Sequence, residues 1–213
     1  MTARKARFST EGKELYCFAD TLALCDALLA AGARIIQLRE KTLGDAAFLR
    51  LAGQMADRVR RHPGAVFIVN DRVAAALAVG ADGVHIGQED ADYRDVLQRV
   101  PPGMLGGVSV DIVDQALAAQ AAGADYLGAG AVFATPTKKD ARVIGLHGLQ
   151  TITAAVSIPV AAIGGISLDN IRQVDAAGAR YFAIISQINQ AGNIAGRLRA
   201  FKECLNGPPG GPC

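Results

Sequence analysis

The sequence predicts a single-domain α/β fold, the (β/α)8 or TIM barrel, from three observations. Four Ala/Val-Gly-Ala triplets each end a helical pattern, a second apolar strand pattern lies in the interval before each of these triplets, and polar side chains gather where the predicted strands end. With 213 residues, 51% of them hydrophobic, the chain can bury one full core. An open, doubly wound sheet of eight strands is the fold alternative.

Each triplet ends a helical pattern rich in Ala and Leu and precedes an apolar run. Gly is the usual residue just past a helix, because it adopts a left-handed backbone without steric cost. The triplets are therefore predicted helix stops, centred on Gly32, Gly80, Gly123 and Gly178.

A further strand is predicted in the interval before each triplet, at residues 15–20, 66–71, 105–110 and 159–164. Each interval then holds two strand-helix units, which makes eight units. Strands that alternate with helices pair in parallel and are covered on both faces. Eight such units in one domain favour a closed barrel over the open sheet.

The predicted barrel spans residues 15–205, with an N-terminal extension at 1–14 and a Gly/Pro-rich, disordered tail at 206–213. A net charge of +2 predicts no nucleic-acid or membrane partner. We see no secretory signal, and no apolar run of the roughly 20 residues that span a bilayer. The four cysteines lack metal-site spacing and are expected to be reduced thiols of a cytoplasmic protein: Cys17, Cys25, Cys204 and Cys213.

The second predicted strand ends in alternating polar side chains. Gln37, Arg39 and Lys41 fall at every second position, so they share one face of an extended chain. Two cations and an amide on one face suit a polyanion. The alternative is a strand end that runs into a solvated, charged loop.

Two carboxylates follow neighbouring strands. Asp71 ends the third strand and Asp90 comes just after the fourth, so they should approach each other at the rim of a barrel. Two protein oxygen ligands, completed by water and substrate phosphate, are a usual Mg²⁺ arrangement. For either aspartate the alternative is a cap on the helix that follows it, and the position of Asp71 before Arg72 suits an N-cap.

A long loop follows the sixth strand and shows no obvious helix before Gly148. Its hydroxyls, Thr135 and Thr137, precede Lys138 and could wrap phosphate oxygens, since long loops are often functional. A solvated turn made by Pro136 is the alternative.

The ends of strands seven and eight carry Gly164-Gly165 and Ile185-Ser186. In a barrel of this class these two ends commonly hold a phosphate on backbone N–H groups. Gly-Gly alone is weak evidence, and its position strengthens it.

Taken together, these motifs resemble the thiamine phosphate synthase family, over residues 15–205. The family joins 4-amino-2-methyl-5-hydroxymethylpyrimidine diphosphate to a thiazole phosphate with Mg²⁺, and releases pyrophosphate. The matching motifs are Gln37-x-Arg39-x-Lys41, Asn70-Asp71-Arg72, Asp82-Gly-Val-His-Ile-Gly-Gln-Glu-Asp90, Gly107-x-Ser109, Thr135-Pro-Thr-Lys138, Gly145-Leu-x-Gly148-Leu, Ile163-Gly-Gly-Ile166 and Ile185-Ser186.

The resemblance implies a role for each matching residue, with small molecules as the only required partners and a homo-oligomer left open. The pyrimidine diphosphate would contact Gln37, Arg39, Lys41, Asn70, Ser109 and Lys138, of which Arg39, Lys41, Ser109 and Lys138 would be catalytic. Mg²⁺ would bind Asp71 and Asp90. The thiazole phosphate would contact Thr135, Thr137, Gly165, Ile185 and Ser186.

The chain departs from the family pattern at two positions. Asp111 stands where a His is frequent, and we interpret it as a helix N-cap. Ala134 replaces a common Pro before Thr135, which predicts a looser loop. His85, inside the fourth strand, is interpreted as a satisfied structural histidine rather than a base.

Two other functions fit the same scaffold. A thiazole tautomerase shares the barrel but generally lacks the diphosphate motifs, so the intact Gln37-x-Arg39-x-Lys41 argues against it. A sensor that binds a phosphate ligand without turnover is the non-enzymatic alternative.

Overall fold

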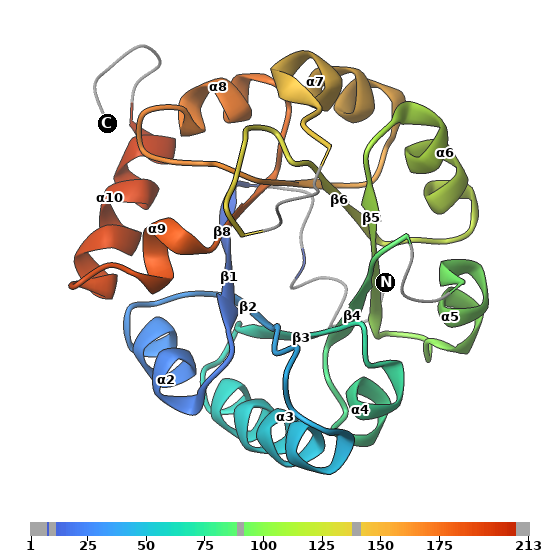
Figure 1. The fold of residues 1–213 in the computed structure, drawn as a ribbon, viewed down its shortest axis with the longest axis vertical. Helices are drawn as coiled ribbons and strands as arrows, with labels where there is room; N and C mark the ends of the chain where they lie inside the picture. The colour runs from blue at the N-terminus through green and yellow to red at the C-terminus, as the bar shows by residue number, and fades with distance from the viewer. Residues whose placement is uncertain (1–7, 9–11, 89–91, 138–141, 208–213) are drawn as a thin grey trace.

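The structure, a computed structural model, describes residues 8, 12–88, 92–137 and 142–207. Eight parallel strands pair in chain order, and the last strand pairs with the first to close the barrel. Helices form an outer ring around the strands (Figure 1). The predicted (β/α)8 barrel is confirmed, and the open-sheet alternative is wrong.

Short strands alternate with helices along the whole barrel. The strands are β1 (Glu14–Ala19), β2 (Ile35–Leu38), β3 (Val66–Asn70), β4 (Gly83–Ile86), β5 (Leu105–Val110), β6 (Tyr126–Ala129), β7 (Val160–Ile163) and β8 (Tyr181–Ile184). The helices are α2 (Leu22–Ala30), α3 (Asp45–Arg60), α4 (Val73–Ala78), α5 (Tyr93–Arg99), α6 (Val113–Ala121), α7 (Gly145–Ala155), α8 (Ile171–Ala176), α9 (Ser186–Asn189) and α10 (Ile194–Asn206). Each described helix is too short or too polar to cross a membrane.

The predicted helix stops are confirmed. After α2, the amide of Gly32 donates to the Leu29 carbonyl and the amide of Ala33 to the Leu28 carbonyl, each at 2.9 Å. This pattern needs a left-handed residue just past the helix. The four triplet glycines have φ of 78°, 60°, 94° and 92°, at Gly32, Gly80, Gly123 and Gly178 respectively.

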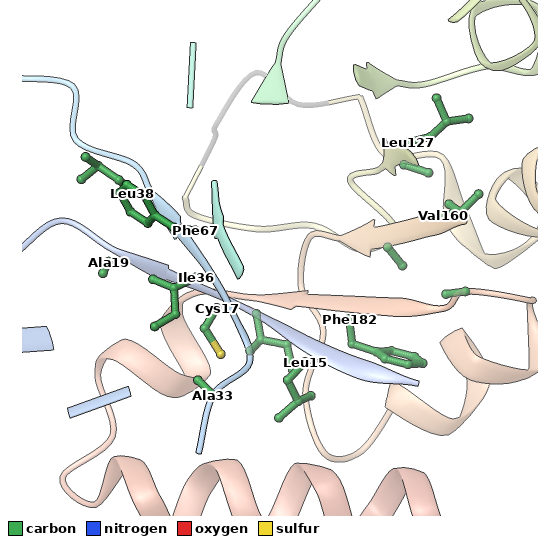
Figure 2. Packing of buried hydrophobic residues seen from close by; sticks show 14 of the residues in the cluster. Leu15, Cys17, Ala19, Ala33, Ile36, Leu38, Phe67, Leu127, Val160 and Phe182 are labelled. Atoms are coloured by element: carbon green, nitrogen blue, oxygen red, sulfur yellow. The ribbon is translucent and has the colours of Figure 1, made fainter. Parts of the chain in front are cut away.

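Side chains of each strand alternate between two apolar clusters. Those that point outward pack against the helices, and Figure 2 shows part of this outer cluster, with Leu15, Cys17, Ile36 and Phe182. Those that point inward fill the barrel, and Phe8 joins them from outside the strands. The buried members of this inner cluster are Phe8, Tyr16, Phe18, Ile35, Val66, Ile68, Leu105, Tyr126, Ala161, Tyr181 and Ala183.

The cysteines follow the prediction only in part. Cys17 and Cys25 are free and buried. Burial raises the pKa of the Cys17 thiol to about 12 and that of Cys25 to about 11, so both are protonated at neutral pH. Cys204 is disulfide-bonded, so the expectation of four reduced thiols is wrong there. Its partner lies outside the described residues, and spacing along the chain could not reveal a bond that depends on three-dimensional approach.

Candidate active site

The predicted site residues that the structure describes, all except Asp90 and Lys138, belong to the carboxyl-terminal half of the barrel. Because all eight strands are parallel, their carboxyl ends form a single rim, and the loops that leave this rim carry the polar motifs. The residues that end the strands are Ala19, Leu38, Asn70, Ile86, Val110, Ala129, Ile163 and Ile184.

Arg39 and Lys41 lie on this rim, just past β2. The Arg39 amide donates to the Ala19 carbonyl at 3.0 Å, so pairing with β1 continues one residue beyond the strand. Among the residues that the structure describes, no side chain pairs with the Arg39 guanidinium. Lys41 Nζ lies 3.8 Å from Asp71 Oδ2, and its side chain is 56% exposed. An exposed pair of this kind contributes about 0–1 kcal/mol, so Lys41 can turn to an anionic ligand at little cost.

Glu40 and Arg72, two residues without a predicted role, hold the loop that carries Lys41. The Glu40 carboxylate accepts from the Thr42 hydroxyl and from the amides of Thr42 and Leu43, both at 2.7 Å. These hydrogen bonds, the Thr42 hydroxyl first, lower the pKa of Glu40. From the next strand, Arg72 donates to the Leu43 carbonyl at 2.6 Å. Arg72 also donates to Asp45 at 3.0 Å, which ties the loop to the start of α4.

Asp71 does not cap α4, so the alternative interpretation as an N-cap is wrong. The N-cap position is Arg72, with no side-chain hydrogen bond to the helix. Asp71 has φ of 60°, a left-handed backbone that is uncommon outside glycine, and its amide donates to the His85 carbonyl at 2.9 Å. The Asn70 side-chain amide donates to Asp71 Oδ2. Asn70 and Asp71 therefore form one unit at the end of β3.

The second expected metal ligand, Asp90, lies outside the described residues. Within residues that are described, no group of three or more His, Cys, Asp or Glu side chains could hold a metal ion. Asp71 remains as one hard oxygen donor at the rim, beside Lys41.

A chain of hydrogen bonds crosses the barrel interior below this rim. It begins at Gln37, whose side chain is buried, with 2% of its surface exposed. Gln37 Nε2 donates to Tyr16 Oη at 2.8 Å, and Tyr16 Oη lies 2.9 Å from Tyr126 Oη. Tyr126 Oη lies 3.0 Å from His85 Nδ1, and His85 Nε2 lies 3.0 Å from Ser109 Oγ. The chain thus joins β2, β1, β6, β4 and β5.

Both ring nitrogens of His85 have partners, as expected for a satisfied histidine. The two tyrosines of the chain were missed from the sequence. The signal for Tyr16 was the alternation of its strand, which places Tyr16 and Phe18 on the inner face. Burial raises the pKa of both Tyr16 and Tyr126 well above the usual value, so both phenols keep their protons.

Two glycines make room for this chain. A Cβ at Gly107 would lie 2.1 Å from Cζ of Tyr126, and a Cβ at Gly128 would lie 2.9 Å from Cε1 of His85. The glycine of the Gly107-x-Ser109 motif is therefore required by the Tyr126 ring.

Gly107→Ala should lower the free energy of unfolding by about 1–3 kcal/mol, because the buried Tyr126 ring must shift. Urea denaturation followed by circular dichroism measures this. Gly53→Ala is the matched control. Gly53 lies inside helix α3, and a Cβ there would come no closer than 4.0 Å to its nearest neighbour, Cγ1 of Val79. We expect it to be neutral or stabilising by up to about 1 kcal/mol. Equal stability of the Gly107→Ala and Gly53→Ala proteins would contradict this account.

The Gly164-Gly165 turn packs against the start of the loop that follows β6. Gly164 and Gly165 have φ of 100° and 64°. A Cβ at Gly165 would lie 2.7 Å from the Ala134 carbonyl oxygen, so the loop approaches as closely as glycine permits. The Phe133 amide donates to the Gly164 carbonyl at 3.0 Å. Asn170 fixes the turn from the other side, because its amide donates to the Gly165 carbonyl at 2.9 Å.

Beyond this turn, the loop brings Thr135 and Thr137 to the same rim. The Thr137 amide donates to Thr135 Oγ1 at 3.3 Å. Lys138 lies outside the described residues. Helix α7 begins at Gly145, three residues before the Gly148 that the sequence suggested.

Ile185 follows β8, and Ser186 begins the four-residue helix α9; both are half-buried. Asn189 of α9 donates to the Phe18 carbonyl at 3.2 Å, which holds α9 against β1. The end of β8 therefore lies on the same rim as the glycine turn after β7, its neighbour in the sheet.

Asp111 is not the N-cap of α6, so that interpretation is wrong. The cap position is Ile112, with no side-chain hydrogen bond. The Gln115 side chain instead accepts from the Asp111 amide at 2.7 Å, and this contact steadies the turn after β5.

Comparisons with known proteins agree with this geometry. The profile of the family described as thiamine monophosphate synthase matches residues 10–188. A thiamine-phosphate synthase of Moorella thermoacetica is 46% identical over 186 residues, which cover 87% of this chain and 88% of that protein. One of Methanoregula boonei is 44% identical over 175 residues, covering 82% of this chain and 81% of that protein.

A solved structure shows the same barrel. The thiamine phosphate pyrophosphorylase of Pyrococcus furiosus superposes with a TM-score of 0.83 at 38% identity, covering 90% of this chain and 95% of that one. The profile match spans far more than half of the chain, and the relatives align over most of their own length. The chain therefore belongs to the thiamine monophosphate synthase family.

Proposed function

We propose that this protein is a thiamine phosphate synthase. It transfers the pyrimidine methylene group of 4-amino-2-methyl-5-hydroxymethylpyrimidine diphosphate to the nitrogen of a thiazole phosphate, with release of pyrophosphate. The observation that carries the proposal is the rim itself. There Arg39, whose guanidinium has no side-chain partner among the described residues, follows β2 two positions before Lys41, and Lys41 pairs with Asp71 at the end of β3. Membership of the family supports the same reaction.

The pyrimidine diphosphate would lie against the ends of β2, β3 and β5. Gln37 Oε1 is buried and has no hydrogen-bond partner among the described residues, although such groups are rarely left unpaired. An amino group on the ligand would satisfy it. Arg39, Lys41, Asn70 and Lys138 would hold the diphosphate, with Ser109 at the junction of diphosphate and pyrimidine.

The chemistry asks the protein to stabilise a leaving anion. In the dissociative route, the carbon–oxygen bond to diphosphate breaks and both electrons stay on the oxygen. The lone pair of the thiazole nitrogen then forms the new carbon–nitrogen bond. Arg39 would offer a two-pronged fork to the oxygens that gain charge, while Lys41 and Lys138 would act as point charges. Electrostatic stabilisation and close placement of the second substrate are the main contributions.

The thiazole phosphate would lie across the neighbouring part of the rim. The hydroxyls of Thr135 and Thr137 and the backbone N–H groups near Gly165, Ile185 and Ser186 are suitable phosphate donors. Support comes from the close packing of the Gly165 turn on Ala134, which brings the two loops together.

Mg²⁺ is the proposed cofactor. Asp71 fits it as a hard oxygen ligand, and Asp90 would be the second. One or two carboxylates, completed by water and phosphate oxygens, are what Mg²⁺ commonly takes in phosphate-handling sites. When bound, Mg²⁺ supplies positive charge to the diphosphate oxygens.

Asp71→Asn should raise the Mg²⁺ concentration needed for half-maximal turnover by about tenfold or more, because a charged ligand is lost. A titration of initial rate against Mg²⁺ measures this. Asp175→Asn is the matched control, since Asp175 pairs with Lys13 at 2.6 Å, before β1 begins and away from the rim. If both variants titrate like the wild type, Asp71 is not a ligand.

The activity itself is tested by mixing both substrates with Mg²⁺ and measuring thiamine phosphate and pyrophosphate. Both products should form in equal amounts. A tautomerase would instead convert a thiazole carboxylate phosphate alone, and a sensor would bind without releasing pyrophosphate. Either of those results would overturn the proposal.

Three expectations from the sequence stay predictions. They are a cytoplasmic location, partners limited to small molecules with assembly into a homo-oligomer left open, and the division of the chain at residues 14 and 205.

A further inference from the structure

In the row of hydrogen bonds from Gln37 to Ser109, counting the protons decides which group donates and which accepts at each contact. Each of the two buried phenols has one proton, and three hydrogen bonds link Gln37, Tyr16, Tyr126 and His85. The structure places Gln37 Nε2, rather than Oε1, 2.8 Å from Tyr16 Oη, and an amide N–H can only donate, so Tyr16 accepts there. The Tyr16 proton then goes to Tyr126, and the Tyr126 proton goes to His85 Nδ1.

The reverse assignment at Tyr126 leaves a buried proton without an acceptor. If Tyr126 donated to Tyr16, the Tyr16 hydroxyl would accept two hydrogen bonds, one from Gln37 and one from Tyr126. Its own proton would then have no acceptor among the described residues. A buried donor without a partner costs about 1–3 kcal/mol. A doubly protonated His85 has the same consequence, because its Nδ1–H would force Tyr126 to donate to Tyr16.

We propose that Tyr16 and Tyr126 are positioning residues that hold His85 as the neutral tautomer protonated at Nε2, which makes the Ser109 hydroxyl a donor that faces the mouth of the barrel. His85 Nε2–H donates to Ser109 Oγ, so the Ser109 proton points away from His85. Ser109 lies near the end of β5 on the inner face, and is half-buried.

The backbone of Ser109 is held independently. The Gln88 side-chain amide donates to the Ser109 carbonyl at 2.6 Å. The backbone from which the Ser109 hydroxyl extends is therefore held in place. The hydrogen bond from His85 Nε2 to Ser109 Oγ then restricts rotation of the side chain. Given the proposed function, such a donor contacts an oxygen of the departing diphosphate, where a pre-oriented hydroxyl costs no reorganisation as charge develops.

The tautomer can be observed directly. The protein has three histidines, so long-range proton–nitrogen correlation on ¹⁵N-labelled, ligand-free protein gives a simple spectrum, and a His85→Asn variant assigns it. Spectra are taken above about pH 8, where a histidine of ordinary pKa is neutral. We expect protonated Nε2 and bare Nδ1 at His85. Protonation at Nδ1 would mean that His85 donates to Tyr126 and accepts from Ser109, which reverses the hydrogen bonds and overturns the proposal.

Tyr126→Phe removes one link with little change in volume. It should convert His85 to a mixture of tautomers and lower kcat about tenfold, with a smaller change in KM. In a Ser109→Ala background, Tyr126→Phe should change kcat by less than about twofold, because its effect passes through that hydroxyl. Tyr181→Phe is the matched control, a tyrosine of the same inner cluster outside the chain, and should leave the His85 tautomer unchanged.

The outcomes separate this proposal from the proposed function. A wild-type tautomer that survives Tyr126→Phe, or additive losses in the double variant, contradicts the positioning role while the reaction stands. If the spectra of the wild type and of Tyr126→Phe are both as expected but thiamine phosphate never forms, the proposed function fails, and the assigned direction of the hydrogen bonds stands.

Discussion

Arg39→Ala is expected to lower turnover about 10²- to 10³-fold and to leave stability almost unchanged. Removing one donor that faces developing negative charge costs about 2.7–4 kcal/mol of transition-state stabilisation. No side chain among the described residues pairs with the guanidinium, so the free energy of unfolding should change by less than about 0.5 kcal/mol. Steady-state kinetics and urea denaturation of the same preparation measure both quantities.

Arg34→Ala is the matched control for this variant. Arg34 directly precedes β2, so it lies at the opposite end of the strand that Arg39 follows, and its side chain is 59% exposed. It should keep wild-type turnover. Arg39→Lys should fall between the two, because it keeps the charge and loses the planar fork. Wild-type turnover in Arg39→Ala would remove Arg39 from the catalytic groups.

Phe8→Ala is expected to lower the free energy of unfolding by about 3–5 kcal/mol, the largest stability effect that we predict. Phe8 is 5% exposed, and its ring centroid lies 4.7 Å from that of Tyr126 and 4.3 Å from that of Tyr181. Both tyrosines begin their strands, so Phe8 fills the end of the barrel away from the active-site rim. A cavity there cannot collapse easily between paired strands.

Thermal unfolding by calorimetry measures this effect, and the Tm should fall on the order of 10 °C. Leu49→Ala, at a 42% exposed position on α3, is the control and should change the Tm little. At a temperature where it is folded, the Phe8→Ala protein should keep most of its turnover. A Tm equal to that of the wild type would show that Phe8 does not contribute to the core.

The fold could be predicted because its signals are local. A glycine past a helix and an apolar run after it are both read within a few residues, and Gly32, Gly80, Gly123 and Gly178 all adopt the left-handed backbone that was expected. The rim followed from topology, since parallel strands bring their ends together. Alternation along β2 also placed Gln37 correctly, because its side chain points into the barrel and contacts Tyr16.

The interior could not be predicted, because it depends on which side chains meet when the barrel closes. Tyr16 and Tyr126 are 110 residues apart, and nothing in either local sequence indicates the other. Phe8 lies in a polar stretch without periodicity. The helix-cap interpretations of Asp71 and Asp111 were wrong for a related reason. A short polar residue before a helix is a common cap, but here the Asn70 side chain donates to the Asp71 carboxylate, and the Gln115 side chain accepts from the Asp111 amide.

The most direct measurement of the central claim is a crystal structure of the protein with Mg²⁺ and pyrophosphate. We predict that the phosphate oxygens lie within hydrogen-bonding distance of the Arg39 guanidinium and Lys41 Nζ, with the metal on the Asp71 carboxylate. Pyrophosphate bound elsewhere, with Arg39 turned to solvent, would contradict the assignment of this rim as the site where the leaving group is held.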